Sequence, residues 1–160
     1  MQIIFLILAF LTILSGCNMS DSKGKYSEDA NAFNQLISLE TPLSPIRWEV
    51  FGTPEYDDGV PGPTDYLTLI AEVQPIRDEI FKGLPTGKSV WIAPESARNW
   101  LNPKFQRFLT GSKNTSIDMT EVSDCRVLTG LAKKTSRPVT GMVCRGENSM
   151  LLYVTIANYT

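Results

Sequence analysis

The last third of the chain contains three strand-like segments separated by turns, and this arrangement limits the folds that the chain can adopt. The segments are 124–131, 139–145 and 150–159. In a hairpin centred on the turn at 133–136, Cys125 lies opposite Cys144, and Thr129 lies opposite Thr140. Opposed Cβ atoms are about 4.5–5.5 Å apart, which a disulfide bond can span after a modest local adjustment. The sequence therefore predicts a disulfide-linked hairpin that continues into a three-strand meander.

Shorter periodic segments precede this meander. Alternating or apolar runs predict strands at 46–51, 66–73 and 89–93. Helical spacing predicts short helices at 32–39, 75–81 and 96–101, the last broken at Pro103 and resumed through Leu109. We expect Trp91, Trp100 and Phe105 to pack in the core, and Arg98, Lys104 and Arg107 to be solvated. The chain is therefore predicted to form one α+β domain around an antiparallel sheet of about six strands, with two or three short helices.

An apolar run near the first residue ends in a motif with small residues and a cysteine. The run covers 3–13, and Leu14-Ser15-Gly16-Cys17 follows it. Eleven residues are too few to span a bilayer, which needs about 20, but they suit the hydrophobic region of a secretory signal peptide. The motif resembles the lipobox of bacterial lipoproteins. A buried N-terminal strand or helix that ends in Cys17 is the alternative.

The resemblance has consequences for processing and location. In lipoproteins the leader is cut before the cysteine, which then carries acyl chains. The resemblance implies that residues 1–16 are a signal peptide, and that acyl chains on Cys17 bind the protein to a membrane of the cell envelope. Asn18 favours the outer membrane, facing the periplasm, in a Gram-negative host. The chain departs from the usual pattern because Met1-Gln2 contains no Lys or Arg to set the orientation of the leader.

The segment after the lipobox is rich in Ser, Asp, Lys and Asn and poor in apolar residues. Such a composition is typical of a flexible tether. We therefore expect residues 17–32 to comprise the lipidated Cys17 and a tether, and residues 33–160 to form a single globular domain.

The chain contains no histidine. Its absence excludes Ser-His-Asp and Cys-His catalysis and histidine-ligated metals, and the cysteines are too few for an all-cysteine zinc site. An exported pair, Cys125 and Cys144, is expected to be bridged. A redox-active pair is the alternative, but the C-x-x-C spacing is missing. The sequence predicts no metal, no cofactor and no enzymatic activity.

The formal net charge of −2 predicts no nucleic-acid partner, but the charges are unevenly distributed. The segment 125–145 contains five basic residues and no acidic one. These are Arg126, Lys133, Lys134, Arg137 and Arg145. They either form ordinary solvated faces and turns or belong to a bipolar surface that orients a charged partner.

A long connection at 52–65 combines glycines, prolines and acidic residues. Loops of this length are often functional, and prolines lower the entropy cost of presenting side chains to a partner. Tyr56, Asp57 and Asp58, with Tyr66 at the end of the loop, form the candidate binding loop. The acidic spacing does not match an EF-hand. A long hairpin connection without a partner is an equally good interpretation.

These features favour a membrane-anchored envelope lipoprotein that acts as a non-enzymatic binding module. It could be an inhibitor, an immunity protein or an assembly accessory protein, with an envelope protein or a cell-wall component as its partner. One alternative is a purely structural envelope lipoprotein. Another is a hydrolase that uses carboxylates such as Asp57 or Asp58, and two buried acids within about 10 Å in one pocket would favour it.

Overall fold

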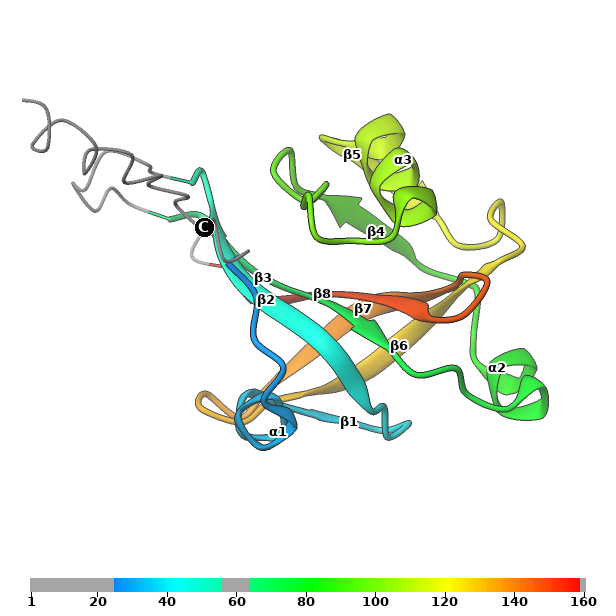
Figure 1. Cartoon of the computed structure of the whole chain (residues 1–160), viewed down its shortest axis with the longest axis horizontal. Coiled ribbons are helices and arrows are strands. Elements are labelled where there is room, and N and C mark those ends of the chain that lie inside the picture. Colours follow the sequence, from blue (N-terminus) through cyan, green and yellow to red (C-terminus); the bar gives the residue numbers. More distant parts are fainter. Residues whose placement is uncertain (1–24, 56–63, 159–160) are drawn as a thin grey trace, which may run out of the picture.

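The computed structural model describes residues 25–55 and 64–158, and its main feature is a six-stranded antiparallel sheet (Figure 1). The strand order is β1-β6-β7-β8-β3-β2. Its strands are β1 (Ile37–Leu39), β2 (Pro45–Thr53), β3 (Tyr66–Val73), β6 (Cys125–Ala132), β7 (Arg137–Arg145) and β8 (Met150–Asn158). The predicted α+β class, the six-stranded sheet and the C-terminal meander are confirmed.

Smaller elements cover the two faces of this sheet. Strands β4 (Ser89–Ile92) and β5 (Thr115–Asp118) form a second, two-stranded sheet. Together with α3 (Pro103–Ser112) they lie above the main sheet in Figure 1, so we call this side the upper face. Helices α1 (Ala30–Leu36) and α2 (Asp78–Gly83) lie below it, toward opposite ends.

The central strands bury side chains on both faces, which creates two cores. The upper core includes Ile70, Met142 and Tyr153, and the lower core includes Leu69 and Leu152. Strands that are buried on both faces contain continuous apolar runs rather than alternating ones. This explains why 150–154 (MLLYV) has no polar residue. Burial on both sides therefore holds the meander at the centre of the domain.

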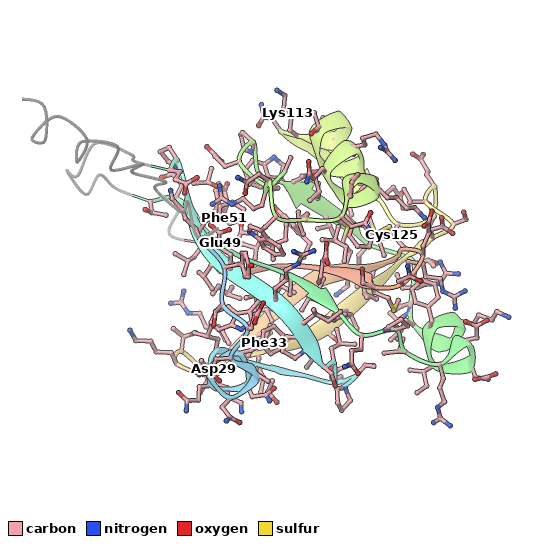
Figure 2. All side chains as sticks on the ribbon, viewed as in Figure 1. Asp29, Phe33, Glu49, Phe51, Lys113 and Cys125 are labelled. Carbon is pink, nitrogen blue, oxygen red and sulfur yellow. A yellow bond between two sulfur atoms is a disulfide. The ribbon has the colours of Figure 1, made fainter. Side chains whose placement is uncertain are left out.

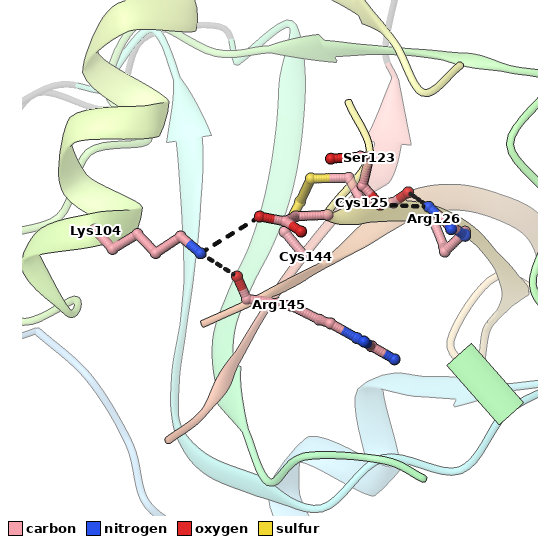
Figure 3. Close-up of a disulfide and its surroundings, with 7 residues drawn as sticks. Lys104, Ser123, Cys125, Arg126, Cys144 and Arg145 are labelled. Atoms are coloured by element: carbon pink, nitrogen blue, oxygen red, sulfur yellow. Dashed lines mark hydrogen bonds and ion pairs between the residues drawn. A yellow bond between two sulfur atoms is a disulfide. The ribbon is translucent and has the colours of Figure 1, made fainter. Parts of the chain in front are cut away.

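The β6–β7 hairpin has the register that the sequence predicts. Cys125 pairs with Cys144 and Thr129 with Thr140, and the two cysteines form a disulfide bond. Lys104 on α3 donates a hydrogen bond to the Arg145 carbonyl at 3.0 Å, beside the disulfide (Figure 3). The disulfide end of the hairpin is thereby joined to the upper layer.

The first predicted helix is displaced in the structure. It spans Ala30–Leu36, because the Asp29 carboxylate accepts hydrogen bonds from the amides of Asn31 and Ala32 and so caps the helix. The last predicted helical residues form β1 instead, because they pair with β6. Packing begins before residue 33, the predicted start of the domain, since Ser27 forms a β-bridge with Trp48.

Two further predictions fail around the second sheet. The segment 96–101 is not helical, and Pro103 begins α3 instead of interrupting a helix. Proline suits the first turn, where an amide hydrogen has no helical acceptor, and Asn102 caps this helix. Strand 89–93 is β4, which pairs with the unpredicted β5 rather than with the main sheet. The sixth strand of the main sheet is β1.

Candidate functional site

A layer of paired charges lies between β2 and the segment 93–102, which joins β4 to α3 across the upper face without forming a helix or strand. We call it the polar seam, and it consists of Arg47, Glu49, Glu55, Glu72, Arg98 and Trp100. Arg47 and Glu49 lie on the same side of β2 as Phe51, because alternate residues of a strand share a face. Figure 2 shows Glu49 beside Phe51 on the side of β2 toward the upper layer.

Glu49 is the buried centre of the polar seam. Its side chain is 6% exposed, and one carboxylate oxygen pairs with the Arg98 guanidinium at 3.0 Å. The other oxygen accepts a hydrogen bond from the Trp100 indole at 2.7 Å. Arg98 also lies over the Phe51 ring, 4.1 Å from its centroid. Both oxygens of this buried acid therefore have partners, which is the condition for keeping a charge away from water.

A second buried acid, Glu72 on β3, is held in the same way. One oxygen accepts hydrogen bonds from Arg47 at 3.0 and 3.3 Å, and the other accepts one from the Asn102 amide. Arg47 in turn lies 5.7 Å from the centre of the Trp100 ring. The two buried carboxylates are thus neutralised by arginines. Their arrangement fastens the upper layer to the sheet.

Glu55 extends the seam to the beginning of the candidate loop. It accepts two hydrogen bonds from Arg98, at 2.7 and 3.1 Å, and pairs with Lys25 at 3.3 Å. The hydrogen bonds from Arg98 lower the pKa of the Glu55 carboxyl from its usual 4.5. At the other end of the loop, Tyr66 packs on Trp91 with ring centroids 4.8 Å apart. Both ends of the connection are therefore fixed to the domain.

A row of threonines crosses the upper face in register. Thr129, Thr140, Thr155 and Thr68 lie on the adjacent strands β6, β7, β8 and β3, each directly opposite the next. Thr68 is fully buried, and its hydroxyl has no hydrogen-bond partner within the described residues. At the other end, the Thr129 hydroxyl donates to the Glu40 carboxylate at 2.6 Å. One end of the row is sealed and the other is accessible.

The accessible end opens into a groove of about 500 Å³. Its lining comprises Ser38, Leu39, Glu40, Lys88, Thr129, Gly130, Leu131, Pro138, Val139 and Thr140. Hydroxyl groups lie beside four apolar residues, and the lining includes one acid and one base. Leu131 is 48% exposed, the largest exposed fraction among the exposed large hydrophobic residues of the described chain. Isolated apolar groups beside hydroxyls suit a ligand that presents both surfaces.

Strand β1 comes close enough to form the groove because β6 has a glycine at the contact. A Cβ atom on Gly130 would lie 2.4 Å from the carbonyl oxygen of Ser38. Any larger residue would therefore push β1 away from β6. The three-residue length of β1 leaves the surface beyond it uncovered. Short β1 and small Gly130 together create the groove.

The predicted site residues have different outcomes. Cys17, Tyr56, Asp57 and Asp58 lie outside the described residues, so their roles stay predictions. Trp100 and Phe105 are buried, as predicted. The prediction that Arg98 is solvated is wrong: its side chain is 14% exposed, because it forms ion pairs with both Glu49 and Glu55.

Neither the groove nor the polar seam is predictable from a local sequence pattern. Glu40, Lys88 and Leu131 are far apart in the sequence, and no spacing rule joins them. Alternation on β2 places two charged residues on its upper face, a pattern typical of a solvated face; the signal for burial was Trp100, which supplies the donor to Glu49.

Two further observations concern metals and membranes. Within residues 25–55 and 64–158, no group of three or more acidic or cysteine side chains is placed to hold a metal ion. None of the helices in the same ranges has the length and apolar character needed to cross a bilayer. Comparisons of the chain with protein-family models, with curated proteins and with solved structures find no match.

Proposed function

We propose that this chain is a lipid-anchored protein of the bacterial cell envelope whose folded domain is a non-enzymatic binding module. The groove between β1, β6 and β7 is the observation that carries the proposal. It offers accessible hydroxyls, an exposed leucine and a charged rim at one place. Such a surface suits recognition of an envelope protein or a cell-wall component, with the membrane anchor at Cys17.

The charged groups near the sheet support binding over hydrolysis. A general acid in a glycosidase needs a carboxyl that can hold a proton at working pH and reach its substrate. Glu49 and Glu72 are each held by an arginine and by a second hydrogen-bond donor. Removing either arginine would destabilise the fold, so these pairs are best explained as structural.

Lipid anchoring is tested by the intact mass of the protein purified from membranes. We expect loss of residues 1–16 and the added mass of acyl chains. A mass equal to that of the unmodified chain would reject the anchor. The variant Cys17→Ser should lose both changes and no longer partition with membranes, whereas Ser20→Ala should keep them.

Binding through the groove is tested by photo-crosslinking in cells. A photoreactive phenylalanine replaces Leu131 in the groove or, as a matched control, Ile80, another partly exposed apolar residue on α2. We expect an adduct of defined mass at Leu131 that is absent at Ile80. Adding Thr140→Arg, which fills the groove, should abolish it. Equal adducts at both positions, or none at Leu131, would reject the binding module and leave the purely structural lipoprotein.

A further inference from the structure

The turn between β6 and β7 concentrates positive charge. Lys133, Lys134 and Arg137 lie in or beside this turn, and all three are exposed. Ser136 has a φ of 52°, a left-handed conformation that helps the chain to reverse within four residues. The reversal brings the three basic residues together, because Ala132 pairs directly with Arg137.

These three charges have no ion-pair partner among the described residues. The acid nearest in register, Glu40, lies opposite Thr129 and accepts its hydroxyl. Like charges on one tight turn repel each other, and the repulsion is relieved when an anionic surface approaches. The contrast with the polar seam is direct, since Arg47 and Arg98 there are paired with carboxylates.

The turn also lies toward the end of the molecule where the described chain begins. In Figure 1 the first described residues and the orange turn between β6 and β7 are both on the left of the long axis, whereas α2 is on the right. Eight peptide links separate Cys17 from Lys25. A chain of that length reaches at most about 28 Å. An anchor at Cys17 would therefore hold this end of the domain close to the bilayer.

We propose that Lys133, Lys134 and Arg137 form a docking surface for the anionic phospholipid headgroups of the membrane that holds the anchor. The proposal rests on the proposed lipid anchor and goes beyond it, because it fixes how the domain is oriented. Each basic residue near an anionic surface strengthens binding by about fivefold, so three of them act as a second membrane signal beside the acyl chains.

The test uses the full protein purified from membranes and reconstituted into vesicles. A fluorescent donor is attached at Thr135→Cys in the turn, and an acceptor is attached to lipid headgroups. Vesicles of phosphatidylcholine alone are compared with vesicles that also contain phosphatidylglycerol. We expect energy transfer to be at least twofold higher with phosphatidylglycerol, and the difference to disappear at high salt because salt screens the charges.

Two double variants keep the test specific. Lys133→Gln with Lys134→Gln should weaken docking about 25-fold and reduce energy transfer to the level on neutral vesicles. Lys82→Gln with Lys113→Gln makes the same change in net charge on exposed residues of other elements and should leave transfer unchanged. Equal transfer on both kinds of vesicle, or equal loss in both double variants, would overturn the proposal.

Failure of the anchor is recognised separately on the same samples. An intact mass without acyl groups rejects lipid anchoring, whereas the energy transfer reports docking of the turn in either case. An acylated protein whose turn gives equal transfer on both vesicles keeps its anchor and loses this inference.

Discussion

The two ends of the upper sheet face differ in whether their polar side chains are buried or accessible. At the β2 end, Glu49 and Glu72 are buried, and the segment between β4 and α3 supplies partners for both oxygens of Glu49 and for one oxygen of Glu72. The other oxygen of Glu72 accepts hydrogen bonds from Arg47 on β2. At the β1 end, Thr129 and Thr140 remain accessible in a groove. Both ends belong to one sheet, so the difference lies in the covering layer. The segment between β4 and α3 can cover charged residues of β2 because it contains Arg98 and Trp100. At the β1 end the sheet surface remains exposed in the groove.

The largest expected effect comes from breaking the polar seam with Arg98→Ala. This change leaves the Glu49 carboxylate buried with Trp100 as its remaining partner. Removing one partner of a buried ion pair costs about 3–5 kcal/mol, so we expect a loss of that size in the free energy of unfolding. Urea denaturation followed by tryptophan fluorescence measures it.

Two controls sharpen this prediction. Lys113→Ala removes an exposed positive charge on the same layer and should cost less than about 0.5 kcal/mol. Arg98→Met combined with Glu49→Leu removes both charges and should recover part of the loss, because no unpaired charge stays buried. A double variant less stable than Arg98→Ala would show that the ion pair itself contributes most of the stability.

The next effect concerns the β6–β7 hairpin, which lies beside β1 and contributes most of the residues that line the groove. Its disulfide lies under α3, and its turn lies near the groove. The bond joins residues 19 apart, and a loop of that size contributes about 3 kcal/mol by restricting the unfolded chain. We expect the double variant Cys125→Ala with Cys144→Ala to lose about 3 kcal/mol in the free energy of unfolding, measured by thermal unfolding. Crosslinking at Leu131 should persist at low temperature, and its loss there would mean that the disulfide also shapes the groove.

Smaller changes in stability, opposite in sign, are expected at the two ends of the threonine row. Thr68→Val replaces a buried hydroxyl that has no partner within the described residues by a methyl of similar size, so it should stabilise by about 1 kcal/mol. Thr129→Val removes a hydrogen bond to Glu40 and should destabilise by about 0.5–1 kcal/mol. Paired urea titrations measure both. Destabilisation by Thr68→Val would mean that its hydroxyl has a partner beyond the described residues or a bound water.

The strands were predictable where local rules and packing agree. Strand β3 has the predicted bounds, and the β6–β7 register follows from the turn and the cysteines. These segments are bounded by turn residues, and successive side chains point to opposite faces of the sheet. Their bounds and register can therefore be predicted from the sequence. The class of the fold and its C-terminal three-strand meander could therefore be predicted from the sequence.

The site depended on tertiary contacts that no local pattern contains. Residues 37–39 lie in a segment with helical spacing but form β1 of the main sheet, whereas the predicted strand β4 pairs with β5 instead of the main sheet. Arg98 resembles a solvated residue until Glu49 and Glu55 are placed beside it. The groove exists because β1 approaches Gly130, which is a consequence of pairing between distant segments.

The smallest expected effect tests the edge of the seam, where it meets the candidate loop. The pKa of Glu55 is lowered from 4.5, chiefly by hydrogen bonds from Arg98, so the fold favours the ionised carboxylate. The ionised Glu55 therefore contributes to the stability of the fold. This contribution is complete above pH 4.5 and is lost as the pH falls through the lowered pKa of Glu55 in the folded protein. Glu55 is partly exposed, so the contribution is below about 1 kcal/mol. Melting temperatures measured on either side of this window should therefore fall less in Glu55→Gln than in the native chain. The exposed Glu147→Gln should follow the native chain, and an equal fall in all three would place the acid sensitivity elsewhere in the domain.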